Sequence, residues 1–158
     1  LFISGYTSKV AGTEAGVTEP QTTFSTCFGA PFMPLHPTKY AEMLSDKVGK
    51  TGINVWLINT GWNGQKKRMS LKDTRAVINA ALEGKLDNID YKKDPFFGFE
   101  IPVSIEGVDS TKLYPANSFD SHETYEENAK VLAAKFKANF KTFEEFASKE
   151  LLAGGPVI

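Results

Sequence analysis

Residues 53–82 read INVWLINTGWNGQKKRMSLKDTRAVINAAL, and this stretch decides the fold class. Its first seven residues, Ile53 to Asn59, are mostly apolar and predict a buried strand. Residues Thr60 to Met69 are polar and predict a loop, and Ser70 with Asp73 has the spacing of a capping box at a helix start. A strand therefore leads through a loop into a helix. This order predicts an α/β fold, in which ligands favour the carboxyl ends of strands.

Local signals predict further helices on both sides of this stretch. His36-Pro37 opens a helix that ends before Gly52, because proline suits a first turn and glycine follows helix ends. Gly84 ends the helix of the opening stretch in the same way. Asp120 and Glu123 predict the cap of a later helix, whose core-facing stripe is Tyr125, Ala129, Leu132, Phe136 and Phe140. Thr142 and Glu145 predict the start of a last short helix, so that helices occupy about residues 121–152.

Two weaker signals concern extended chain. The segment 97–101 predicts a short strand within an irregular, proline-broken region. Leu1 to Ile3 form an apolar run that stops at Ser4-Gly5, which predicts the end of a buried strand whose beginning lies upstream. Residues 5–23 show no apolar period of either kind and predict a long loop. Loops longer than about 12 to 15 residues are usually functional or disordered.

Composition excludes several classes of protein. The 158 residues carry a net charge of −1, whereas nucleic-acid binders usually show a strong basic excess, and no stretch reaches membrane-spanning length. We therefore expect neither a nucleic acid nor a membrane as partner. Cys27 cannot form an internal disulfide, and His36 and His122 offer no familiar zinc spacing. A reducing, cytoplasmic location is the default expectation.

Short catalytic motifs are weak in this chain. Gly49-Lys50-Thr51 matches the end of a phosphate-binding P-loop, but Leu44 stands at the required glycine position and the predicted helix precedes the strand. We therefore interpret it as a helix C-terminus. The carboxylate pairs 126–127 and 144–145 lie on predicted solvated helix faces. We expect no catalytic residue and no metal ligand in this segment.

Longer motifs, in one order along nearly the whole chain, resemble those of ATP-dependent phosphoenolpyruvate carboxykinases. They are Ser4–Glu14, Gly16–Pro20, Thr23–Ser25, Cys27–Gly29, Leu35–Ala41, Asn59–Trp62, Lys67-Arg68, Lys72–Arg75, Pro102 and Ala153–Pro156. The family converts oxaloacetate and ATP to phosphoenolpyruvate, carbon dioxide and ADP with Mg²⁺ and Mn²⁺. Its P-loop, metal ligands and oxaloacetate-binding arginines lie N-terminal to this region. The resemblance implies that residues 1–158 are the last portion of a mixed α/β nucleotide-binding domain, which is incomplete without the upstream chain.

The resemblance also assigns roles to residues. Within the segment of about 59–75, Arg68, Met69 and Thr74 fall where the family binds the adenosine part of ATP. Met69 replaces an isoleucine often seen there, which matters little if its backbone contacts the base. Residues of about 5–18 correspond to an active-site lid that excludes water from the enolate intermediate. The implied lid residues are Gly5, Thr7, Lys9, Gly12, Thr13, Glu14 and Gly16.

Two alternatives remain open. One is a non-catalytic interaction module that docks through its aromatic helix at residues 125–140, and the other is a fragment of an unrelated P-loop kinase. The failed P-loop argues against the kinase, and the ordered motifs argue against the module. For a carboxykinase segment, we expect the chain alone to be inactive and poorly stable, because the 53–59 strand would lack sheet neighbours.

Overall fold

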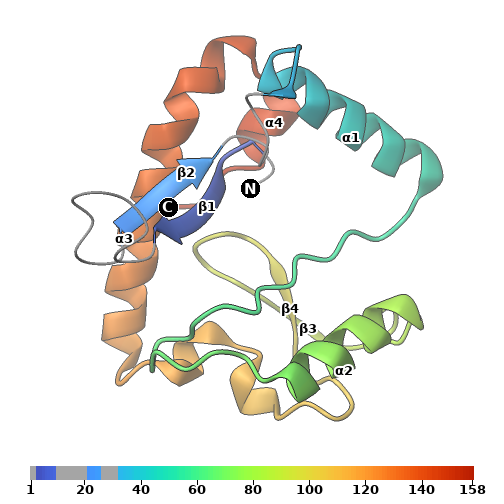
Figure 1. The fold of residues 1–158 in the computed structure, drawn as a ribbon, viewed down its shortest axis with the longest axis vertical. Coiled ribbons are helices and arrows are strands. Elements are labelled where there is room, and N and C mark those ends of the chain that lie inside the picture. The colour runs from blue at the N-terminus through green and yellow to red at the C-terminus, as the bar shows by residue number, and fades with distance from the viewer. Residues whose placement is uncertain (1–2, 10–20, 26–31) are drawn as a thin grey trace. The chain divides into compact units, whose positions relative to one another are not determined.

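The computed structural model describes residues 3–9, 21–25 and 32–158 (Figure 1). The chain divides into two compact units. The first unit comprises Leu1–Asn54 with Lys135–Gly155, and the second comprises Val55–Ala134 with Pro156–Ile158. Helices alternate with short two-stranded antiparallel sheets, in agreement with the predicted α/β class. Among the described helices, none combines the length and the apolar character needed to cross a membrane.

A β-hairpin stands near the start of the first unit. Strand β1, Gly5–Lys9, pairs antiparallel with β2, Gln21–Ser25, and Tyr6 lies directly opposite Phe24 (Figure 1). The rings of both residues contact Phe136, at centroid distances of 6.0 Å and 5.1 Å. The prediction of a continuous loop over 5–23 is therefore wrong at both ends. Backbone pairing and one cross-strand aromatic pair stabilise the hairpin without an apolar period.

Helix α1, Pro37–Thr51, confirms the sequence prediction for this region. Pro37 occupies the first turn, and Gly52 follows the end with a left-handed φ of 63°. The N–H of Gly52 donates to the carbonyl of Val48 at 2.9 Å. Glycine reaches this conformation without a steric penalty, which is why it ends the helix here.

The C-terminal part of the first unit differs from its prediction. A 3₁₀ helix, η5, spans Lys141–Phe146, and the last α-helix, α4, spans Lys149–Ala153. The cap of α4 is Ser148, whose hydroxyl accepts a hydrogen bond from the N–H of Leu151 at 3.3 Å. Thr142, the predicted cap, instead donates to the carbonyl of Asn139 at 2.9 Å. Its hydroxyl is thus used by the preceding helix.

The predicted strand at residues 53–59 does not form. These residues have no regular secondary structure, and Ile53, Val55 and Leu57 are 59%, 58% and 63% exposed. A strand requires a neighbour to pair its backbone N–H and C=O groups. Among the described residues, no strand pairs its backbone with this segment. Strong β propensity alone is therefore insufficient here.

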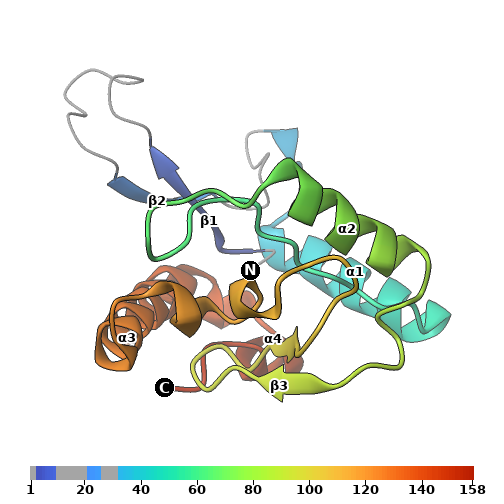
Figure 2. The ribbon, with the colours of Figure 1, turned by 90° about the horizontal axis from the view of Figure 1, so that it is seen from below.

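In the second unit, helix α2, Leu71–Leu82, packs against segments without regular secondary structure. Val77 and Ala80 are buried on one face of α2 and contact Leu86 and Ile105. Figure 2 shows the preceding loop running directly into α2. The capping-box prediction is confirmed, because Ser70 caps α2 and Gly84, with a φ of 68°, follows its end.

A second hairpin and two 3₁₀ helices complete the irregular region. Strand β3, Tyr91–Lys93, pairs with β4, Glu100–Pro102, and η3 and η4 span Ser110–Lys112 and Pro115–Ser118. The strand predicted at 97–101 therefore starts late. Gly98 has a φ of 72°, and its N–H donates to the carbonyl of Asp94 at 3.0 Å. The residues just before β4 therefore form a turn instead of extending the strand.

Helix α3, His122–Phe140, begins in the second unit and ends in the first. Its cap is Ser121, whose hydroxyl accepts from the N–H of Thr124 at 3.2 Å, so the predicted Asp120 cap is wrong by one residue. The predicted stripe is confirmed at Tyr125, Ala129 and Phe136, which are all buried. The Tyr125 hydroxyl donates to Asp94 at 2.7 Å. Burial of the hydroxyl is the larger cause that raises the Tyr125 pKa, and the hydrogen bond to Asp94 is the second.

Candidate functional site

The loop before α2 folds back on itself and is held by its own backbone. Trp62 and Arg68 form an antiparallel bridge, and the N–H of Met69 donates to the carbonyl of Gly61 at 3.2 Å. At the tip, the side-chain oxygen of Asn63 accepts from two backbone N–H groups, those of residues 65 and 67, at 3.1 Å and 2.9 Å. These bonds fix Arg68 and Met69 at the entrance to α2.

The start of α2 is fixed by a buried carboxylate. Ser70 accepts from the N–H of Asp73 at 3.0 Å and donates its hydroxyl proton to the Asp73 carboxylate at 2.8 Å. The ammonium of Lys112 donates to the same carboxylate oxygen at 2.8 Å. The hydrogen bond from Lys112, and next that from Ser70, hold the pKa of Asp73 below its ordinary value. Asp73 thus remains ionised and holds the first turn in place.

A pocket of about 300 Å³ lies where this loop meets α2. Its lining comprises Thr60, Arg68, Met69, Leu71 and Thr74. Three of these five, Arg68, Met69 and Thr74, are the residues for which adenosine binding was predicted. The volume lies at the lower end of the range usual for small-molecule sites, which suits a flat ring system rather than a whole nucleotide.

Thr60 and Leu71 complete the pocket, although no role was assigned to them individually from the sequence. Both belong to the predicted 59–75 segment. Their position in the sequence could have identified them, because Thr60 directly follows the apolar run and Leu71 directly follows the helix cap. Residues at these two points flank the loop, so they face the pocket once the loop folds back.

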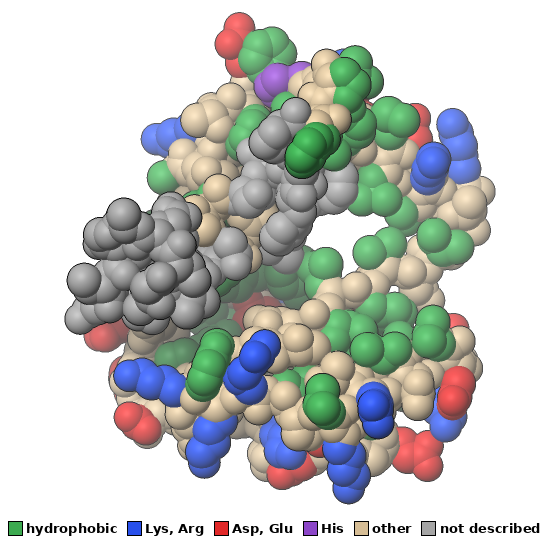
Figure 3. Space-filling view, in the orientation of Figure 1, with side chains coloured by type: hydrophobic (Ala, Val, Ile, Leu, Met, Phe, Trp, Pro, Cys, Tyr) green, Lys and Arg blue, Asp and Glu red, His purple; other side chains and the backbone are tan. Residues whose placement is uncertain are grey.

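The surroundings of the pocket are basic. Arg68 is exposed, and no described carboxylate pairs with its guanidinium, which lies 6.0 Å from the centroid of the Trp62 ring. Lys66, Lys67 and Lys72 are exposed in the same segment. Lys and Arg side chains are numerous on this part of the surface, in the lower half of Figure 3. Such a surface attracts anionic ligands such as phosphates.

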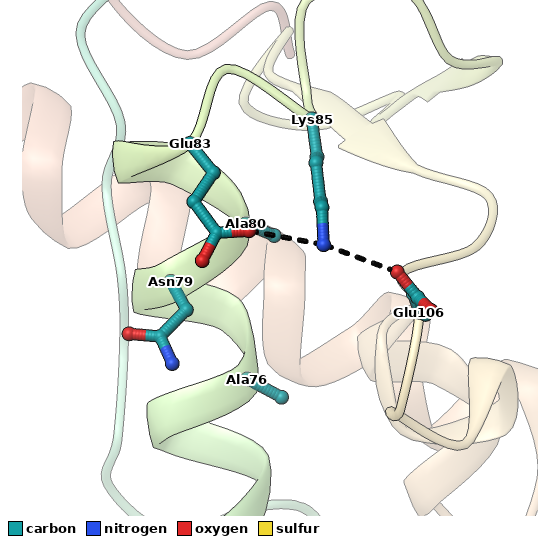
Figure 4. A pocket seen from close by; sticks show the side chains of 6 residues that line it. All are labelled: Ala76, Asn79, Ala80, Glu83, Lys85 and Glu106. Atoms are coloured by element: carbon teal, nitrogen blue, oxygen red, sulfur yellow. Dashed lines mark hydrogen bonds and ion pairs between the residues drawn. The ribbon is translucent and has the colours of Figure 1, made fainter.

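A second pocket, of about 230 Å³, lies at the other end of α2 (Figure 4). Lys85 dominates its chemistry and pairs with Glu83 at 2.9 Å and with Glu106 at 3.3 Å. The hydrogen bonds that the ammonium donates to Glu83 and, next, to Glu106 raise the Lys85 pKa, so the ammonium stays charged. One ammonium faces two carboxylates, so the three groups together carry a net negative charge. This pocket therefore offers an ion-pair network rather than a reactive group.

The remaining sequence candidates are dispersed. Gly49-Lys50-Thr51 forms the last turn of α1, as expected for a helix C-terminus. Glu126 pairs with His122 and Lys130 on an exposed face of α3.

Of the predicted lid residues, Gly5, Thr7 and Lys9 lie in β1, whereas Gly12, Thr13, Glu14 and Gly16 lie outside the described residues, as does Cys27. Across residues 3–9, 21–25 and 32–158, no group of three or more His, Cys, Asp or Glu side chains could hold a metal ion.

Comparison with known proteins gives one consistent result. The model of the family described as phosphoenolpyruvate carboxykinase matches residues 1–111. A protein of Flavobacterium johnsoniae is 59% identical over 160 residues, one of Christiangramia forsetii is 56% identical over 160, and one of Bacillus pumilus is 51% identical over 161. Each is named phosphoenolpyruvate carboxykinase (ATP). Each match covers 99% of this chain but only 30% of the relative.

Proposed function

The chain belongs to the phosphoenolpyruvate carboxykinase family, and we propose that it forms part of an ATP-dependent enzyme that converts oxaloacetate and ATP to phosphoenolpyruvate, carbon dioxide and ADP. The chain spans about 30% of the length of its curated relatives. Catalysis, oxaloacetate binding and the coordination of Mg²⁺ and Mn²⁺ are therefore assigned to the rest of the enzyme. This chain contributes the adenosine end of the ATP site.

The convergence of Arg68, Met69 and Thr74 on one pocket is the observation that supports this role. The N–H of Met69 is already bonded to Gly61, and no described residue donates to the Met69 carbonyl. That carbonyl can accept a hydrogen bond from the exocyclic amine of adenine. Guanine has a carbonyl oxygen at the equivalent position, and two acceptors would face each other. The pocket thus favours adenine over guanine.

Two side chains would hold the rest of the adenosine. The Arg68 guanidinium is planar and can lie against the purine face or donate to it. The Thr74 hydroxyl can donate to, or accept from, the base or the ribose. With the base fixed in this way, the phosphates extend toward the groups of the remaining enzyme. Fixed geometry of this kind is the main contribution of a protein to phosphoryl transfer.

A lid role for residues 5–18 is a second part of the proposal. It is supported by the resemblance of this segment to the family lid and by the anchoring of β1 and β2 on Phe136. Closure over the active site would exclude water from the enolate formed by decarboxylation. Protonation of that enolate would give pyruvate instead of phosphoenolpyruvate. The lid would therefore protect the yield of the reaction.

The exposed segment 53–59 is the third part. Its exposed apolar side chains suit a strand that joins a sheet supplied by the rest of the enzyme. By contrast, docking through the aromatic helix has no support here, because Tyr125, Ala129 and Phe136 are already covered by the chain's own residues. The interaction-module alternative is therefore not favoured.

Replacement of Arg68 in the complete enzyme tests the proposal. Arg68→Ala should weaken ATP binding by about 1.5 to 3 kcal/mol if its hydrogen bond is charge-assisted, and leave the KM for oxaloacetate nearly unchanged. Lys50→Ala is the control, since Lys50 is an exposed cation in the last turn of α1 and does not line the pocket. Unchanged ATP affinity in Arg68→Ala would remove the pocket from the nucleotide site. Equal losses for ATP and oxaloacetate would indicate a folding defect instead.

A further inference from the structure

Trp62 is a large exposed aromatic residue in the loop that carries Arg68. Its side chain is 69% exposed, although burial of an indole is strongly favourable. Trp62 stands directly opposite Arg68 in the antiparallel bridge. Side chains of such a pair lie on the same face and within contact distance. The guanidinium carbon of Arg68 is 6.0 Å from the ring centroid, at the outer limit of a cation–π contact.

Arg68 has no other described side-chain partner that would restrict it. An unpaired arginine samples many rotamers, and ordering it when a ligand binds costs conformational entropy. Trp62 does not itself line the pocket, whereas Arg68 does. The indole therefore acts on the ligand only through the guanidinium that it faces.

From this geometry we propose that Trp62 is a positioning residue, which pre-orders the Arg68 guanidinium at the edge of the pocket for the purine of ATP. The proposal rests on the proposed adenosine site. A cation–π contact at an exposed position corresponds to about a two- to fivefold change in affinity. Trp62→Ala should weaken ATP by that factor. Trp62→Phe keeps an aromatic face and should recover part of the loss.

A double-mutant cycle in the complete enzyme separates this role from a structural one. ATP dissociation constants and oxaloacetate KM values are measured for the wild type, Trp62→Ala, Trp62→Phe, Arg68→Ala and the Trp62→Ala/Arg68→Ala double variant. In the Arg68→Ala background, Trp62→Ala should have no further effect on ATP, and oxaloacetate KM should stay constant throughout. Phe99→Ala, which removes another exposed aromatic ring, is the control and should leave ATP binding unchanged.

Three outcomes would overturn the proposal. If Arg68→Ala weakens ATP and Trp62→Ala does not, the nucleotide site stands and Trp62 has no part in it. Fully additive losses in the double variant would show that Trp62 acts independently of Arg68. If Arg68→Ala itself leaves ATP binding unchanged, the proposed adenosine site fails, and the positioning role fails with it.

Discussion

The Asp73 carboxylate lies 2.8 Å from the ammonium of Lys112, which follows it by 39 positions in the chain. Asp73 is buried at the first turn of α2, and Lys112 reaches it from η3. A carboxylate at this position also interacts favourably with the N-terminal end of the helix dipole. The pair therefore connects α2, whose first turn borders the candidate pocket, to η3, which is distant in the sequence.

This pair predicts how stability depends on pH. The folded pKa of Asp73 lies below its ordinary value of 3.8, so its contribution is fully present above pH 3.8 and is lost as pH falls through the folded pKa. Asp73→Asn should consequently lower the urea midpoint of the complete enzyme at neutral pH, with the difference from wild type shrinking at acid pH. Lys112→Met should raise the Asp73 pKa. A constant difference across the pH range would contradict this account.

Gly64 predicts a steric effect on the same loop. Its N–H donates to Ser118 at 2.9 Å, and a Cβ at this position would lie 2.6 Å from the Phe119 ring and 2.7 Å from the Ser118 carbonyl. Gly64→Ala should cost about 1 to 3 kcal/mol of stability. ATP should also bind more weakly, because the loop that carries Arg68 must shift.

A matched control exists for this glycine substitution. Gly49 lies in α1, and no atom lies within 4 Å of the Cβ that alanine would add. Gly49→Ala should stabilise the protein by about 0.5 to 1 kcal/mol, because alanine favours helix over glycine. Thermal unfolding and ATP titration of both variants check the pair. Equal effects in the two variants would mean that the contact with Phe119 is not responsible.

Thr74 predicts a smaller effect on the nucleotide than Arg68. Thr74→Val keeps the shape of the side chain and removes one neutral hydrogen bond, so ATP affinity should fall by about 0.5 to 1.5 kcal/mol. Thr51→Val makes the same change at the exposed end of α1 and should leave ATP binding unaffected. Isothermal titration of the complete enzyme measures both. A change in oxaloacetate KM of the same size would indicate a general structural effect.

The exposed segment 53–59 predicts the behaviour of the chain on its own. A purified 158-residue chain should show no carboxykinase turnover and should associate or precipitate, because its exposed apolar side chains favour contact with other copies of the chain. Light scattering and an activity assay measure these properties. Adding the rest of the enzyme as a separate polypeptide should reduce the association. Turnover by a monodisperse sample of the chain alone would contradict the prediction.

The lid proposal predicts a change of product. Replacing residues 11–16 by a shorter linker in the complete enzyme should leave ATP binding largely intact, lower turnover and raise the share of pyruvate in the product. Product analysis after oxaloacetate consumption measures this share. A shortened enzyme that keeps full turnover and makes no additional pyruvate would refute the lid role.

The sequence by itself determined the features whose hydrogen bonds close within one helical turn. The Ser70 cap and Gly52 were predictable because their partners, Asp73 and Val48, lie three and four positions away. The family was predictable because long motifs occur in one order, and the candidate residues Arg68 to Thr74 because they fall within one such motif. None of this required knowledge of distant contacts.

Only the tertiary structure decided which distant segments meet. β1 pairs with β2 so that Tyr6 stands opposite Phe24, and Ser118 accepts a hydrogen bond from the N–H of Gly64 at the loop tip. The strand at 53–59 was mispredicted for the same reason, since β structure depends on a neighbour that propensity does not specify. Hydrogen bonds within a turn form wherever the local residues allow them. Long-range pairs form only where folding brings complementary surfaces together, and a single sequence does not state where that is.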